Sequence, residues 1–183
     1  MPGEPGVWVL VGGDLLLFSL FFIVFLVYRA GDTARFVTSQ HSLDQFIGAL
    51  NTVLLLTSSL FVALAVKAVR TGNQSARSAP MWIASAALLG AGFVAVKAFE
   101  WSARFAAGQT VNTNDFFMFY FMYTGIHLVH VLLGLIVLAM LFFVVRRPSL
   151  DAGAIRLVEA GGIFWHLVDL LWVILFALFY LLK

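Results

Sequence analysis

Five long apolar runs constrain the fold of this sequence more than any other feature. Each run is about 20 residues or longer, and short polar stretches separate the runs. A helix of about 20 residues spans a hydrocarbon core of roughly 30 Å. The pattern therefore predicts an all-α integral membrane protein with five transmembrane helices. The predicted spans are Val7–Tyr28, Asp44–Val66, Pro80–Ala103, Phe116–Val145 and Leu157–Leu182.

The composition supports the same class. The chain has 183 residues, of which 62% are hydrophobic and 11% are charged, and a soluble domain of this length could not bury so many apolar side chains. The runs lack the alternation over about 10 residues that strands of membrane barrels show. No loop between the runs exceeds about 15 residues, so we expect no extramembrane domain that would hold a nucleotide, a soluble cofactor or a copper centre. We therefore expect a single transmembrane domain over residues 1–183. The chain has no cysteine, which excludes thiolate metal sites.

The distribution of Lys and Arg predicts the orientation of the spans, since cytoplasmic loops carry an excess of both. Six of these residues belong to one side of the membrane and four to the other. This bias predicts a multi-pass protein of the cytoplasmic (inner) membrane with its N-terminus in the cytoplasm and its C-terminus outside. The first set is Lys67, Arg70, Arg77, Arg146, Arg147 and Arg156, and the second is Arg29, Arg35, Arg104 and Lys183.

Capping residues mark several predicted helix ends. Ser42 and Gln45 have the spacing of a capping box at the second span. The segment 112–115 (Asn-Thr-Asn-Asp) offers caps for the fourth span, and Pro148 is expected to end its extension. The aromatic run from Phe116 to Tyr123 covers more than one helix face, so we expect it to pack against lipid.

Ionisable side chains inside the spans need a specific explanation, because such groups are costly in hydrocarbon and usually face the bundle interior. We expect them to form a buried hydrogen-bonded network between helices. Lys97 and Glu100 are three residues apart, so they are able to neutralise each other. The predicted network is Asp14, Lys97, Glu100, His127, His130, His166 and Asp169.

These groups have three other possible interpretations: a metal site, a haem site and a proton path. His-x-x-His on one helix and His-x-x-Asp on the next offer metal ligands, but at 1.5 Å of rise per residue the groups spread over much of the membrane thickness. At most His130, His166 and Asp169 would converge on one ion. Haem ligation would need two facing histidines at one depth, whereas His127 and His130 share one helix. A proton path would need water between the ionisable groups, which lie at different depths in the membrane. We therefore predict neither a metal ion nor a catalytic residue.

Glu159 has a different setting, near the start of the last span. It follows Arg156 by three residues, so one interpretation is an ion pair that helps the helix begin. The other is a contact with a phospholipid headgroup, to which nearby arginines would contribute phosphate ligands. The predicted lipid-binding residues are Glu159, Arg146, Arg147 and Arg156.

Two motifs in the last two spans resemble subunit III of the haem–copper oxidases (cytochrome c oxidase). The penultimate helix of that family carries Thr-Gly-x-His-x-x-His-x-x-x-Gly, and the last carries Trp-His-x-x-Asp-x-x-Trp. Glu100-Trp101 and Glu159 also resemble family positions, and the resemblance covers essentially the whole chain. The matching motif residues are Thr124, Gly125, His127, His130 and Gly134, then Trp165, His166, Asp169 and Trp172.

The resemblance implies an accessory subunit with no haem or copper of its own. Members of the family pack against catalytic subunit I, hold lipid in a cleft between helix groups, and support proton uptake. By similarity, Asp14 and Glu159 would line the cleft and the histidine motifs would build the core. The chain resembles the five-helix form of the family. Its segment Pro2–Trp8, followed by Gly13 and Asp14, is similar to the branch found with nitric oxide reductases.

The alternative function is a small stand-alone transporter or proton channel built on the same polar groups. Transporters are often built from inverted repeats with helices broken by Gly or Pro. The five predicted spans show neither feature clearly, which disfavours this alternative.

Overall fold

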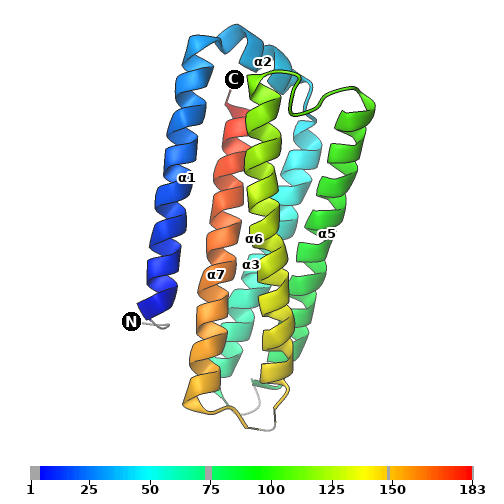
Figure 1. The fold of residues 1–183 in the computed structure, drawn as a ribbon. Helices are drawn as coiled ribbons and strands as arrows, with labels where there is room; N and C mark the ends of the chain where they lie inside the picture. Colours follow the sequence, from blue (N-terminus) through cyan, green and yellow to red (C-terminus); the bar gives the residue numbers. More distant parts are fainter. Residues whose placement is uncertain (1–4, 73–75, 148, 183) are drawn as a thin grey trace.

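The chain folds into long helices that run side by side (Figure 1). The computed structural model describes residues 5–72, 76–147 and 149–182. Five helices in this described part are long and apolar enough to cross a membrane, which confirms the predicted all-α membrane fold. The elements are α1 (Pro5–Gly31), α2 (Thr33–His41), α3 (Gln45–Thr71), α5 (Ala79–Ala106), α6 (Asp115–Val145), α7 (Ala152–Phe176) and the π-helical turn η1 (Ala177–Leu181).

Four of the spans form a bundle and the fifth packs on its outside. Helices α3, α5, α6 and α7 pack against one another, and successive spans run in opposite directions. Helix α1 packs against α6 and α7, while the short helix α2 crosses one end of the molecule. The N-terminus and the C-terminus lie at opposite ends of the bundle (Figure 1), as an odd number of spans requires.

The helix ends agree with some of the predicted caps and correct others. Asn114 is the N-cap of α6 and accepts a hydrogen bond from the Phe117 N–H at 3.0 Å, as predicted. The predicted capping box is wrong: Asp44 caps α3, and Ser42 ends α2. The reason is α2 itself, whose nine mostly polar residues are too few to be recognised as a span. Pro148 lies outside the described residues, and α6 ends at Val145.

The tryptophan of the last-span motif occupies the centre of the bundle. A Cβ atom added at Gly90 would lie 2.8 Å from the Trp165 ring, and one at Gly134 would lie 2.6 Å from it. The two glycines therefore let α5 and α6 approach this ring closely. Trp165 Nε1 donates to Ser58 Oγ at 3.1 Å, and Ser58 donates to the Ala86 carbonyl. The indole is thus fully buried and also hydrogen-bonded.

The aromatic run at the start of α6 faces inward, so its predicted packing against lipid is wrong. Six of the eight residues from Phe116 to Tyr123 are buried, and only Met122 is exposed. Rings from α1, α2 and η1 cover this run, with edge-to-face contacts from Phe25, Phe36 and Phe179. The sequence pattern did not reveal this packing, because α2 is too short and polar to be recognised as a span. The apolar pattern of α1 and of the last span, which includes η1, does not specify which rings they bring to α6.

Helix α1 is the least covered of the five spans. Within its most apolar stretch 11% of residues are buried, against 28–50% in the other spans. Phe18 and Phe25 pack into the core, whereas Val9, Leu16 and Val27 are more than half exposed. Most of α1 therefore faces whatever surrounds the protein in the membrane.

Candidate functional site

The seven ionisable residues predicted to form one network occupy four separate places. In the described part of the chain, no hydrogen bond joins one place to another. Lys97 and Glu100 share one place, and Asp14 and His130 share a second. His166 and Asp169 lie on successive turns of α7, and His127 lies alone.

The first place is a sealed ion pair in the C-terminal part of α5, toward the end of the bundle that α2 crosses. Lys97 and Glu100 are 1% and 0% exposed, and Lys97 Nζ donates to Glu100 Oε2 at 2.9 Å. Lys97 also donates to the hydroxyl oxygens of Tyr120 at 3.1 Å and Tyr180 at 3.0 Å. Tyr180 donates its own proton to Glu100 Oε1 at 2.6 Å. The predicted ion pair is present, and its polar atoms are satisfied within the chain.

The two tyrosines are members of this site that the sequence pattern did not reveal. Tyr120 was hidden in the aromatic run of α6, and Tyr180 lies in η1. The widened turn of η1 is closed by the Leu182 N–H, which donates to the Ala177 carbonyl at 2.9 Å. Gln45 in turn donates to the Tyr180 carbonyl at 2.6 Å, so α3 also fixes this turn.

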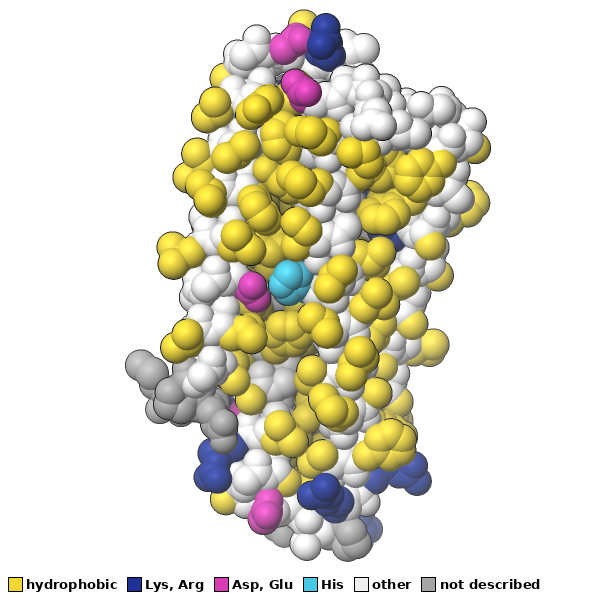
Figure 2. Space-filling view, viewed as in Figure 1, with side chains coloured by type: hydrophobic (Ala, Val, Ile, Leu, Met, Phe, Trp, Pro, Cys, Tyr) yellow, Lys and Arg dark blue, Asp and Glu magenta, His cyan; other side chains and the backbone are white. Residues whose placement is uncertain are grey.

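The second place is an open pair between α1 and α6. His130 Nε2 lies 3.6 Å from Asp14 Oδ1, which is longer than a hydrogen bond. His130 Nδ1 lies 2.9 Å from the Ile126 carbonyl, to which it donates. The two side chains are 17% and 20% exposed, so each reaches the outer surface of the bundle. Figure 2 shows a histidine and an acidic side chain side by side within a hydrophobic face.

The third place lies between α7 and α3. His166 Nδ1 is 2.5 Å from the hydroxyl of Ser59, and His166 as a whole is exposed. Asp169 is 9% exposed, and its Oδ1 has no hydrogen-bond partner among the described residues. Ser59 is a further polar residue at this place that the two motifs do not include, and a hydroxyl inside an apolar span was the available signal.

The fourth place is an isolated histidine in the core. His127 is 0% exposed, and neither ring nitrogen has a hydrogen-bond partner in the described chain. Its ring packs edge-to-face against Phe93, with 5.8 Å between the ring centroids, and its centroid lies 5.4 Å from that of Trp172. No three His, Asp or Glu side chains of the described residues are placed to share a metal ion.

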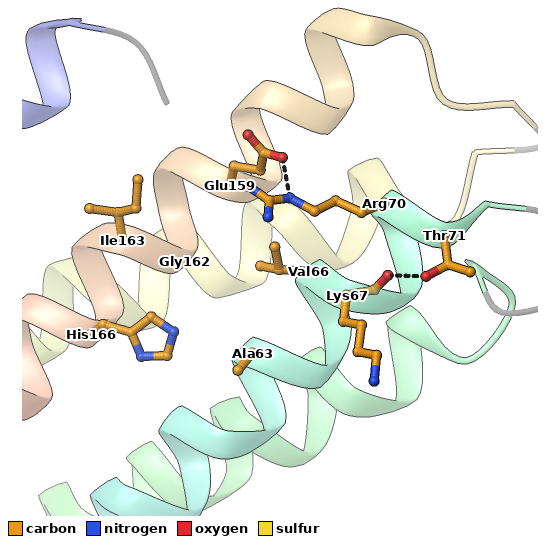
Figure 3. Close-up of a pocket in the computed structure, with 9 residues that line it drawn as sticks. All are labelled: Ala63, Val66, Lys67, Arg70, Thr71, Glu159, Gly162, Ile163 and His166. Atoms are coloured by element: carbon orange, nitrogen blue, oxygen red, sulfur yellow. Dashed lines mark hydrogen bonds and ion pairs between the residues drawn. The ribbon is translucent and has the colours of Figure 1, made fainter. Parts of the chain in front are cut away.

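Glu159 lines a pocket of about 380 Å³ between the adjacent ends of α3 and α7 (Figure 3). Its Oε1 accepts a hydrogen bond from Arg70 Nε at 2.5 Å. The predicted partner was Arg156, and the structure instead pairs Glu159 with a residue of another helix. Lys67, His166 and Gly162 also line the pocket. Asp14, expected by similarity beside Glu159, does not line it.

Two of the three arginines predicted to bind lipid with Glu159 line a second pocket. Arg146 and Arg147 line it together with Arg77, and Arg146 also stacks on the Phe142 ring with 5.3 Å between its guanidinium carbon and the ring centroid. Arg156 lines neither of these two pockets. The predicted lipid-binding residues are thus divided between separate surfaces at the same end of the bundle.

The family comparison agrees with the two motifs. The family model described as "Cytochrome c oxidase subunit III" matches residues 4–183. This chain belongs to the cytochrome c oxidase subunit III family. The family motifs lie at residues 124–134 and 165–172 of this chain. They include Gly134 and Trp165, which pack against each other, and the histidines at 127, 130 and 166 described above.

Similar proteins come from several respiratory oxidases. Cytochrome c oxidase subunit 3 of Alkalihalophilus pseudofirmus is 32% identical over 178 residues, covering 97% of this chain and 85% of that protein. Quinol oxidase subunit 3 of Bacillus subtilis is 28% identical, with coverage of 97% and 85%. The haem–copper oxidase subunit I+III of Aeropyrum pernix is 28% identical over 97% of this chain and 22% of its own length. As a family member, this multi-pass membrane protein is an accessory subunit of a haem–copper oxidase.

Proposed function

We propose that this chain associates with catalytic subunit I of its oxidase and stabilises it without a redox centre of its own. The observation that carries the proposal is the family match over residues 4–183. The Aeropyrum pernix relative, which is named as subunit I+III, supports a close association of the two subunits. The sealed, hydrogen-bonded core around Lys97 supports a scaffold role for the bundle.

Mild solubilisation of the native membrane tests this proposal. We expect the tagged chain to co-purify with a larger haem protein, and the chain separated from it to show no haem absorbance. A chain that purifies alone with stoichiometric haem or metal would contradict the proposal. Proton or solute flux in liposomes that hold this chain alone would instead favour the transporter alternative.

The same proposal includes bound phospholipid and support of proton uptake. Arg77, Arg146 and Arg147 line one surface at the end of the bundle where α6 ends and α7 begins. Their guanidinium groups are suitable ligands for phosphate. The pocket with Lys67, Arg70 and Glu159 offers a second polar surface beside apolar side chains. Native mass spectrometry of an Arg146→Gln/Arg147→Gln variant should show less bound phospholipid than an Arg156→Gln control. Equal lipid occupancy in the two variants would remove the lipid proposal for this surface.

We also propose that the N-terminus is cytoplasmic. On the face drawn in Figure 2, Lys and Arg gather at the end of the bundle that holds the N-terminus of α1. This bias follows the excess of positive charge in cytoplasmic loops. Because the chain lacks cysteine, a single Cys introduced at Ser149 or at Arg35 can be labelled selectively. An impermeant maleimide added to intact cells should label the Arg35→Cys chain and spare the Ser149→Cys chain; the reverse result would invert the orientation.

The terminal acceptor is the remaining part of the proposal. The opening segment resembles the branch associated with nitric oxide reductases, whereas the relatives above are named as cytochrome c and quinol oxidase subunits. Oxygen and nitric oxide consumption by the purified complex would separate these two possibilities.

A further inference from the structure

Asp14 and His130 form a polar pair that the described part of the chain leaves unsatisfied. The gap of 3.6 Å between Oδ1 and Nε2 exceeds a hydrogen-bond length. No hydrogen bond from the described residues reaches the Asp14 carboxyl group. Both side chains are partly exposed on the outside of the bundle rather than enclosed by it.

The hydrogen bonding of His130 fixes what the pair can accept. Because a carbonyl oxygen only accepts hydrogen bonds, Nδ1 carries a proton and donates it to Ile126. If the ring is neutral, Nε2 is then an acceptor that faces the acceptor oxygens of Asp14. One proton shared between Nε2 and the carboxyl group relieves this conflict but leaves further carboxyl lone pairs free. The pair therefore has room for a hydrogen-bond donor from outside the chain.

The pair lies deep in the membrane. His130 is at the midpoint of α6 (Asp115–Val145), about 22 Å from either end at 1.5 Å per residue. The hydrocarbon core extends only about 15 Å to either side of its centre. Phospholipid headgroups lie beyond that distance, and acyl chains offer no hydrogen-bond donor. Lipid alone therefore does not satisfy an acidic group at this depth.

The surface beside the pair is open to a close approach. A Cβ atom added at Gly12 or Gly13 would meet nothing within 4 Å, so these glycines are not used for packing inside the chain. Small residues let the backbone of a second helix come near. Leu10 and Leu17, one turn to either side of Asp14, are 49% and 44% exposed.

We propose that this face of α1 and α6 is a docking surface for a transmembrane helix of another subunit, which carries a hydrogen-bond donor to Asp14 at mid-membrane. The inference rests on the proposed function, since it takes the partner from the same oxidase complex. Suitable donors are a hydroxyl, an amide, an indole or a cationic side chain. The partner helix would cover Gly13 and bring its donor against the free lone pairs of the carboxyl group.

Photo-crosslinking in intact membranes tests the surface. A benzophenone amino acid replaces Leu17 in one tagged chain and, as a control, Leu88 in another. Leu88 lies on α5, is 74% exposed and is away from α1. Illumination should join the Leu17 position to another subunit of the oxidase, identified by mass spectrometry, with a yield several times that of the Leu88 position. Adding Asp14→Leu should lower this yield about threefold to tenfold, and Asp14→Asn, which keeps an acceptor oxygen, should lower it less.

Three results would overturn the inference while leaving the proposed function intact, provided that the haem protein still co-purifies with the chain. They are crosslinks from position 17 to lipid only, no crosslink from position 17, and a yield that Asp14→Leu leaves unchanged at equal amounts of chain. If no haem protein co-purifies with the unmodified chain, the proposed function fails. In that case a crosslink from position 17 to some other membrane protein would also contradict the inference, because the proposed partner is a subunit of the oxidase.

Discussion

The ion pair of Lys97 and Glu100 differs from the pair of Asp14 and His130, although both lie inside transmembrane helices. The first is at most 1% exposed and is hydrogen-bonded to two tyrosines of the same chain. The second is 17–20% exposed and separated by 3.6 Å. The first pair is complete within the subunit, whereas no described residue donates a hydrogen bond to the carboxyl group of the second.

The difference shows how one kind of residue can serve two purposes in a membrane subunit. Ionisable groups that the chain satisfies itself fix the register of its own helices. Groups that remain open at the outer surface need a partner, because hydrocarbon does not solvate them. Exposure and hydrogen-bond satisfaction, rather than residue type, therefore distinguish the core of the scaffold from its interface.

The largest effect is expected from breaking the sealed pair. Lys97→Met leaves the Glu100 carboxylate buried without its cation, and removing one partner of a buried ion pair costs about 3–5 kcal/mol. Unfolding of the purified chain by a denaturing detergent, followed by circular dichroism, measures this loss. The double variant Lys97→Met/Glu100→Leu should recover about half of it or more, because no buried charge remains. A single variant as stable as the unmodified chain would contradict the sealed-pair account.

A smaller loss is expected from Tyr180→Phe. This variant removes the donor to Glu100 and one acceptor for Lys97, and leaving charged groups underbonded costs about 1–3 kcal/mol. Tyr120→Phe removes only one acceptor and should cost less in the same unfolding experiment. Tyr28→Phe is the control, since Tyr28 is 49% exposed. Equal stabilities for Tyr180→Phe and the control would show that the Tyr180 hydroxyl does not stabilise the ion pair of Lys97 and Glu100.

His127→Leu should change the free energy of unfolding by less than about 1 kcal/mol, because the ring makes no hydrogen bond within the described chain. Removing an unsatisfied buried polar group can even stabilise a fold. The same unfolding measurement tests this expectation beside Tyr180→Phe. A loss as large as that of Tyr180→Phe would reveal a hydrogen-bond partner for His127, such as an internal water molecule.

Arg70→Gln should have a comparable or smaller effect on stability, below about 1 kcal/mol, since the Arg70 side chain is 51% exposed and exposed ion pairs contribute little. The loss should shrink further at high salt, where exposed charges are screened. Lys67→Gln, in the same pocket, is the matched control. A loss that is independent of salt would indicate that this pair is shielded from water.

The sequence was sufficient to predict the spans and the family. Apolar length identified all five spanning helices, and the predicted ends lie within about five residues of the observed ones because helices extend past the hydrocarbon core. The two motifs of the last spans predicted the family that the comparison confirms. Both successes depend on local patterns, which a single sequence displays directly.

The partners of the polar residues could not be predicted in the same way. Glu159 binds Arg70, which is 89 positions away, rather than the nearby Arg156. Tyr180 contacts Glu100 only because η1, which continues α7, lies beside the C-terminal part of α5. The hydropathy of a span does not specify its rotation or its neighbours, and these determine which side chains meet.

The central claim is that the chain satisfies Lys97 for itself but leaves Asp14 for a partner. The most direct test compares Asp14→Leu with Lys97→Met in the same membranes, measuring the amount of folded chain and the haem protein retained per chain after mild solubilisation. We predict that Asp14→Leu leaves the amount of chain unchanged and lowers the retained haem protein, whereas Lys97→Met lowers the amount of chain. An Asp14→Leu chain that is depleted from the membrane, yet retains the usual haem protein per chain, would contradict this claim.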